Sequence, residues 1–127
     1  MAGELVDAFE TKIMDLLTGV STAAPVALPL KVALLTALGS DSAAGTEVSG
    51  GSYVRQNITF AAASAGAASN SALVSFTGMP ACVVVGFAIY DNGGARVWNI
   101  TRAGGSLTVN VGDTVQIAAG AVVLSAD

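Results

Sequence analysis

The first apolar residues of the chain recur with helical spacing. Between residues 4 and 17 they return every three or four positions, while acidic residues and Lys12 occupy most of the opposite face. The apolar positions are Leu5, Val6, Phe9, Ile13, Leu16 and Leu17. Acids in the first turn favour a helix start, and Gly19 is a suitable residue to end the helix. The pattern predicts an amphipathic helix over residues 4–17, with a stripe that must pack on a sheet, a second copy or another protein.

After residue 29 the apolar period shortens to about two, which is the period of a strand. Pro25 and Pro29 in the connector over residues 20–29 disfavour helix. Short apolar runs follow, separated by glycine, asparagine and serine. The expected strands cover residues 30–36, 53–60, 72–76, 82–90, 96–101, 107–109, 114–118 and 121–124. The sequence therefore predicts a mainly β protein, an antiparallel β-sandwich or barrel of about seven or eight strands with one N-terminal amphipathic α-helix.

The change of period also suggests a domain organisation. Residues 1–29 form the N-terminal helix and Pro-containing connector, and residues 30–127 form a compact β-domain. A chain of 127 residues has the usual length of one domain. Within the β-domain we expect a loop over residues 64–70, a hairpin turn over residues 91–94 and a surface loop over residues 36–51.

Residues 45–56 read GTEVSGGSYVRQ and contain a glycine cluster. A phosphate-binding loop places its glycines between a strand and the start of a helix, and a Gly-Lys-Ser/Thr sequence often follows. Here the residues after Gly51 favour a strand, and no such sequence follows. The cluster is therefore interpreted as turn chemistry, in which glycine supplies positive φ angles.

Composition excludes several function classes. The net charge is −4, and five lysines and arginines are scattered along the chain, so we expect neither nucleic acid nor membrane as a partner. The chain has no histidine and one cysteine, which argues against a disulfide within the chain, a metal site and a cofactor. The acidic start lacks the basic residues of a signal peptide, so synthesis in a cytoplasm is expected.

Candidate catalytic groups also have simpler interpretations. Cys82 begins an apolar strand and is interpreted as an inert buried thiol. The acids Glu47, Asp91 and Asp113 lie in turn sequences, where carboxylates are ordinary, although a carboxylate pair would suit a glycosidase. Calcium binding by Asp41, Asp91, Asn92 and Asp113 would require their loops to converge. We therefore expect no enzyme activity.

Two aromatic positions leave alternatives open. Trp98 could form a sugar-stacking platform, but its apolar neighbours favour a half-buried strand residue. Tyr53 and Arg55 share one face of the expected strand, which favours a structural pair.

The segment GTEVSGGSYVRQ, after LKVALLTA at residues 30–37, resembles a family of small virion proteins of tailed bacteriophages. The members are labelled tail-fibre-like, head-fibre-like or capsid-decoration proteins. The resemblance continues through ITF at 58–60, ASN at 68–70, GFAIYD at 86–91, the glycines at 93 and 94, VGDT at 111–114 and AG at 119–120. It covers roughly residues 30–124 and implies a compact β building block without catalytic residues.

The resemblance and the composition together predict a phage virion structural protein, made in the host cytoplasm. The preferred role is capsid decoration, in which a homo-oligomer such as a trimer binds the major capsid protein on the outer shell. A tail fibre or tail-tip protein is the alternative, and a carbohydrate-binding module is a second. The candidate interface residues are Leu5, Phe9, Ile13, Leu16, Leu17, Glu47, Ser49, Gly50, Gly51, Tyr53 and Arg55.

Overall fold

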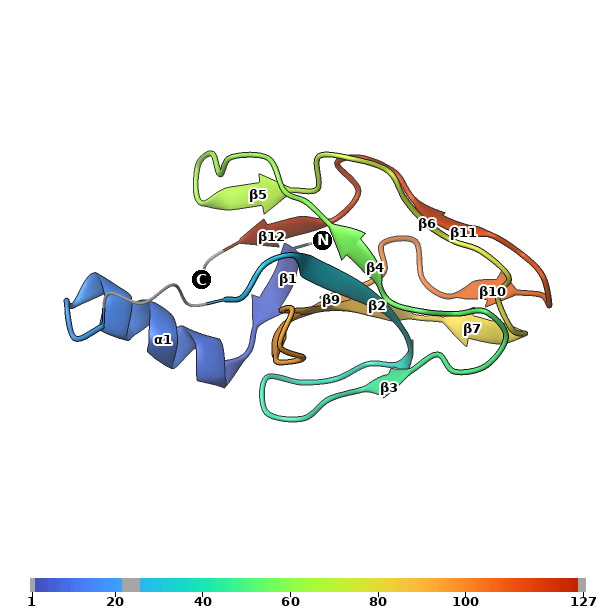
Figure 1. Ribbon diagram of the computed structural model, residues 1–127, viewed down its shortest axis with the longest axis horizontal. Helices are drawn as coiled ribbons and strands as arrows, with labels where there is room; N and C mark the ends of the chain where they lie inside the picture. The colour runs from blue at the N-terminus through green and yellow to red at the C-terminus, as the bar shows by residue number, and fades with distance from the viewer. Residues whose placement is uncertain (1, 22–25, 126–127) are drawn as a thin grey trace.

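One helix and twelve strands make up the computed structural model over the residues it describes, 2–21 and 26–125 (Figure 1). The helix is α1 (Asp7–Leu17). The strands are β1 (Ala2–Leu5), β2 (Leu30–Ala37), β3 (Thr46–Glu47), β4 (Gln56–Ile58), β5 (Ala67–Ser69), β6 (Val74–Phe76), β7 (Cys82–Val84), β8 (Gly86–Tyr90), β9 (Arg96–Thr101), β10 (Leu107–Val109), β11 (Val115–Ile117) and β12 (Val123–Ser125). The predicted mainly β fold with one helix near the N-terminus is confirmed.

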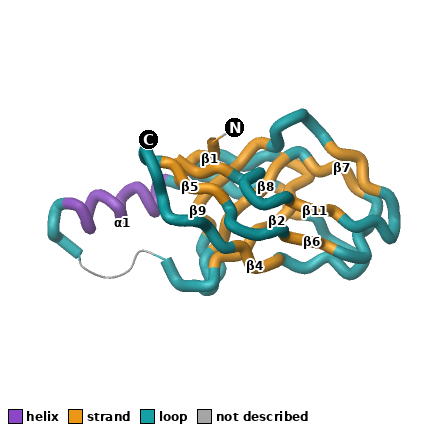
Figure 2. Tube along the Cα trace, turned by 90° about the horizontal axis from the view of Figure 1, so that it is seen from above, coloured by secondary structure: helices purple, strands orange, loops and turns teal. Residues whose placement is uncertain are grey.

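An eight-stranded sheet forms the main part of the fold. Its order is β3-β2-β8-β9-β1-β12-β5, and β4 pairs with β2 beside β3. All of these pairs are antiparallel except β1 with β12, which run parallel. Two separate ribbons, β10-β7 and β11-β6, lie at the end of the molecule opposite α1 (Figures 1 and 2).

The main core lies between the large sheet and the β6–β11 ribbon. Val32 and Leu34 of β2 and Ile89 of β8 face Phe76 and Ile117, and all five side chains are buried. The opposite face of the sheet is also covered, because Ala33, Leu35 and Ala88 form a second buried cluster. Burial on both faces explains why β2 is nearly continuously apolar instead of alternating.

The chain enters the fold as a strand before it becomes helical. Residues 2–5 pair with β9 on one side and β12 on the other, so α1 begins at Asp7 and not at residue 4. Val6 keeps an extended conformation, and its amide donates to the carbonyl of Val97 at 2.9 Å. The apolar residues Leu5 and Val6 fit a helical stripe and a strand equally well. Pairing of residues 2–5 with β9 and β12 favours the strand over the helix.

Three further differences from the sequence prediction concern short strands. The expected loop over residues 64–70 contains β5, which pairs with β12, and the loop over 36–51 contains β3, which pairs with β2. The single strand expected over 82–90 is divided at Val85 into β7, which pairs with β10, and β8, which pairs with β2 and β9. The two extra strands and the divided strand, together with β1, raise the number of strands above the expected seven or eight.

The predicted strand over residues 53–60 is also shorter. Only Gln56–Ile58 form β4, and an isolated bridge joins Phe60 to Asn70. Val54 is exposed, whereas the half-buried Tyr53 packs against the core together with Ile58. Tyr53 and Ile58 therefore both face the core, and a regular strand alternation does not hold at the start of this segment.

Helix α1 leads away from the sheet toward one end of the molecule (Figures 1 and 2). Its first half contacts the sheet, where Phe9 is buried with Leu5, Val6 and Val97. Among the described residues, no helix is long and apolar enough to span a membrane. The division of the chain at residue 29 stays a prediction, although β1 lies inside the sheet of the β-domain.

Candidate functional site

The segment GTEVSGGSYVRQ forms a polar cluster centred on Glu47. Arg55 donates two hydrogen bonds to this carboxylate from Nε, at 3.1 and 3.3 Å, and one from Nη2, at 2.9 Å. The Tyr53 hydroxyl donates to Oε2 of Glu47 at 2.7 Å and accepts from the amide of Leu34 at 3.0 Å. The Arg55 guanidinium also lies 3.7 Å from the ring centre of Tyr90. The cluster therefore links β3 to β2 and β8.

The contacts in this cluster fix its protonation state. Partial burial of Glu47 opposes ionisation, but the hydrogen bonds from Arg55 and Tyr53 outweigh it and lower the pKa of this carboxyl. Burial and the hydrogen bond to Glu47 raise the pKa of Tyr53. The bond to Glu47 also raises the pKa of Arg55. The group is thus an ion pair with a neutral tyrosine, and the carboxylate and hydroxyl oxygens are hydrogen-bonded within the fold.

The glycine pair in the same segment forms a close turn. Gly50 and Gly51 have φ angles of +106° and +56°. A Cβ on Gly51 would lie 2.6 Å from the carbonyl oxygen of Gly78. This oxygen belongs to the backbone and cannot move aside, so the position has no room for a side chain. The amide of Ser52 donates to this carbonyl at 2.9 Å. The segment therefore packs its turn against residues 78–80, while Ser49 stays exposed.

The predicted helix face is divided between buried and exposed residues. Leu5 and Phe9 are buried, and Ile13 packs partly against them. Leu16 and Leu17 are 40% and 74% exposed. The structure therefore brings the inner half of the face onto the sheet and leaves the outer half without cover from the described residues.

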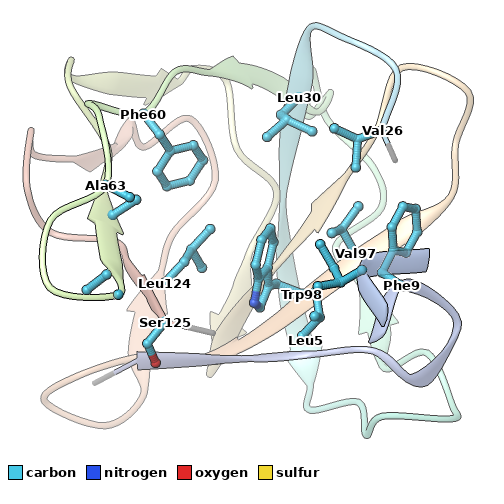
Figure 3. Close-up of a pocket in the computed structure, with 14 residues that line it drawn as sticks. Leu5, Phe9, Val26, Leu30, Phe60, Ala63, Val97, Trp98, Leu124 and Ser125 are labelled. Carbon is cyan, nitrogen blue, oxygen red and sulfur yellow. The ribbon is translucent and has the colours of Figure 1, made fainter. Parts of the chain in front are cut away.

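An apolar pocket lies beside the inner half of the helix and has a volume of about 330 Å³ (Figure 3). Figure 3 shows Trp98 in its middle, with Phe60, Ala63 and Leu124 on one side and Phe9 and Val97 on the other. The full lining is Leu5, Phe9, Ile13, Val26, Leu30, Phe60, Ala63, Gly66, Ala67, Ala68, Val97, Trp98, Leu124 and Ser125. Almost all of this lining is apolar, so it lacks the polar groups that orient a sugar.

Trp98 brings one polar atom to this region. The side chain is half-buried on β9, as the sequence predicted. Its indole Nε1 is inaccessible to solvent, and no acceptor among the described residues lies within hydrogen-bond distance. Buried donors are usually paired, so an unpaired N–H beside an open pocket is unusual.

The remaining candidates for chemistry have structural surroundings. Burial raises the pKa of the half-buried Cys82 thiol, which opposes thiolate formation. Asp91 accepts from the amides of Gly93, Ala95 and Ala27 and so closes the hairpin turn. Within residues 2–21 and 26–125, no three acids or cysteines gather in a way that could hold a metal ion.

The sequence predicted part of this geometry. Tyr53 and Arg55, which were expected to share a face, both bond to Glu47, which was expected only as a turn residue. Leu5, Phe9 and Ile13 of the expected helix face come together, although Leu5 lies on β1. The pocket itself was missed, since five of its fourteen lining residues come from residues 60–68, which have no recognisable period. Small residues such as Ala63, Gly66 and Ala67 give no signal of whether they face a cavity.

Comparison with known proteins gives one family. The family model described as podophage GP4 fiber I protein gp80 matches residues 4–125. The match therefore includes the helix as well as the β-domain. No curated protein sequence matches the chain significantly.

Proposed function

The chain belongs to the podophage GP4 fiber I protein gp80 family, and from this membership we propose that it is a repeated subunit of a fibre on the phage virion. It is a phage virion structural protein. The proposed role is to build the fibre by association with further copies, without enzyme activity. The observation that carries the proposal is the family match over residues 4–125, which includes the described helix, all of β2 to β12 and the second half of β1.

The geometry supports a role in association. The motif around Glu47 is used inside the fold, where it connects strands, and the side-chain oxygens of Glu47 and Tyr53 are already hydrogen-bonded. Exposed apolar side chains lie on the outer half of α1, and an apolar pocket lies beside its inner half. Apolar surface of this kind is typical of contacts between proteins.

Capsid decoration, with the major capsid protein as partner, stays a prediction. A compact β-body with a short helix would also suit a knob on a shell. The word fiber in the family description leads us to prefer the fibre, which the sequence analysis gave as the alternative.

Immunogold electron microscopy of intact virions tests the proposal. The virions are labelled with antibodies against the purified protein. We expect gold only on fibres, and mass spectrometry of purified virions should detect the protein. A virion lacking this gene product serves as the matched control.

The other outcomes contradict the proposal in different ways. Gold spread evenly over the head would replace the fibre with capsid decoration. Absence of the protein from purified virions would contradict both roles.

A further inference from the structure

A second hollow of the surface is polar and lies beside the Glu47 cluster. It has a volume of about 550 Å³, and its walls come from strand β2, from residues 47–55 and from the turn between β8 and β9. The glycine-containing segment over residues 45–56 supplies more than half of the lining residues. This segment therefore shapes the surface in addition to its contacts inside the fold.

Two cationic side chains in this hollow keep donors that no described residue uses. Arg55 donates to Glu47 from Nε and Nη2, and its Nη1 has no acceptor among the described residues. The Lys31 ammonium makes no ion pair or hydrogen bond with a described residue. Lys31 lies opposite Tyr90 in the β2–β8 pair, and the Arg55 guanidinium stacks on the Tyr90 ring. Because opposite residues of an antiparallel pair share a face, both cations lie on the same face of the sheet.

The two carboxylates in the lining are directed to partners within the fold. Glu47 accepts from Arg55 and Tyr53, and Asp91, which is only 9% exposed, accepts from three backbone amides. Their two negative charges balance the positive charges of Lys31 and Arg55. The hollow thus offers unused cationic donors without a net charge from its ionised side chains.

The chemistry of these donors favours a carboxylate as the ligand group. A hydrogen bond between a cationic donor and an anionic acceptor is roughly twice as strong as a neutral one. A carboxylate brings a single negative charge, whereas a phosphate approaches two, and Glu47 and Asp91 would repel the second charge. Glu47 and Tyr90 also fix the orientation of Arg55, so its Nη1 loses little freedom when a ligand binds.

We propose that this hollow binds a small organic carboxylate that also carries hydroxyl groups, which is the chemistry of a sugar acid. The carboxylate accepts from Nη1 of Arg55 and from the Lys31 ammonium. The exposed side chains of Ser49 and Asn92, which also line the hollow, donate to and accept from the hydroxyl groups. The volume is within the usual range for small-molecule sites. This inference goes beyond the proposed role as a fibre subunit and does not rest on it.

NMR spectroscopy of the purified, ¹⁵N-labelled full chain tests the inference, with sodium glucuronate as the probe. We expect saturable shifts of the amide signals of residues 49, 50, 92 and 94, and the titration gives a dissociation constant. Glucose has the same ring with a neutral group in place of the carboxylate, and it should bind about tenfold or more weakly. Sodium phosphate should also bind more weakly than glucuronate.

Lys31→Gln should raise the dissociation constant for glucuronate about tenfold, because it removes one charged donor. Lys12→Gln makes the same change in net charge at an exposed position outside the hollow, and as the matched control it should leave the constant unchanged. Asn92→Asp, in the exposed turn, adds a negative charge to the hollow and should also weaken binding.

A circular dichroism spectrum checks that each variant is folded, and Asn92→Asp decides the question if Lys31→Gln does not fold. The inference is overturned if glucuronate causes no saturable shifts, or if glucose or phosphate binds as tightly. It is equally overturned if Lys12→Gln weakens binding as much as Lys31→Gln, or if Lys31→Gln and Asn92→Asp both leave the affinity intact.

Discussion

Glu47 shows how one carboxylate can hold several strands together. It lies on the two-residue strand β3, which has few hydrogen bonds of its own. Arg55 and Tyr53 hold it in place, Tyr53 continues to the backbone of β2, and Arg55 stacks on Tyr90 of β8. A guanidinium that donates from two nitrogens to one carboxylate is among the stronger polar contacts in proteins. At this scale the segment acts as a clamp on the edge of the sheet.

We predict that Glu47→Gln lowers the free energy of unfolding by about 1–2 kcal/mol, since it removes the charge that Arg55 and Tyr53 contact in a half-buried setting. Urea unfolding measures this change. Asp41→Asn, in an exposed loop, is the control and should have little effect. Equal stability of the two variants would show that the clamp contributes nothing.

Acid should also weaken the fold. The pKa values of Glu47 and Asp91 are lowered below their ordinary values of 4.5 and 3.8. These carboxylates therefore stabilise the protein at pH values above the ordinary pKa. The contribution is lost as the pH falls through the lowered values.

The urea midpoint measured from pH 6 downward checks this pH dependence. The loss should begin below about pH 4.5 and should be smaller in Asp91→Asn, which has one acidic group fewer to protonate. A midpoint that does not change down to about pH 3 would contradict the prediction.

At the scale of elements, the sequence predicted the parts that have a strong apolar pattern. Strand β2 is a nearly continuous apolar run and the inner turns of α1 have a helical period, and the positions of both agree with the prediction. The sequence pattern did not predict strands β1 and β5, because their formation depends on pairing with β12, which lies far away in the sequence. The division at Val85 has the same origin, since its amide donates to Leu35 and its carbonyl accepts from Arg102. Local pattern cannot show such pairing.

The anchoring of α1 is testable at one position. Phe9→Ala should lower the free energy of unfolding by about 3–5 kcal/mol, because Phe9 is only 2% exposed and joins the helix to Val97. Chemical unfolding measures it. Val111→Ala, at an exposed site, should change stability by less than about 0.5 kcal/mol. A small effect of Phe9→Ala would mean that the helix does not depend on this contact.

The whole molecule combines a closely packed body with an uneven surface. Two ribbons occupy one end, and α1 occupies the other (Figures 1 and 2). Only 11% of the residues are charged, so charge alone does little to discourage contact between copies. A surface with so little charge is compatible with the proposed association of repeated copies.

The pairing of β1 between β9 and β12 affects when the fold can form. Of the described strands, β1 is synthesised first and β12 last, yet Ala2 lies beside Val123 and Gly3 beside Leu124. Closing so long a loop carries a large entropic cost, and contacts distant in sequence slow folding. A nascent chain therefore holds an unpaired β1 edge until β12 has left the ribosome. The β1–β12 pair forms only after that point, and a chain interrupted before β12 is left with an open edge that invites aggregation.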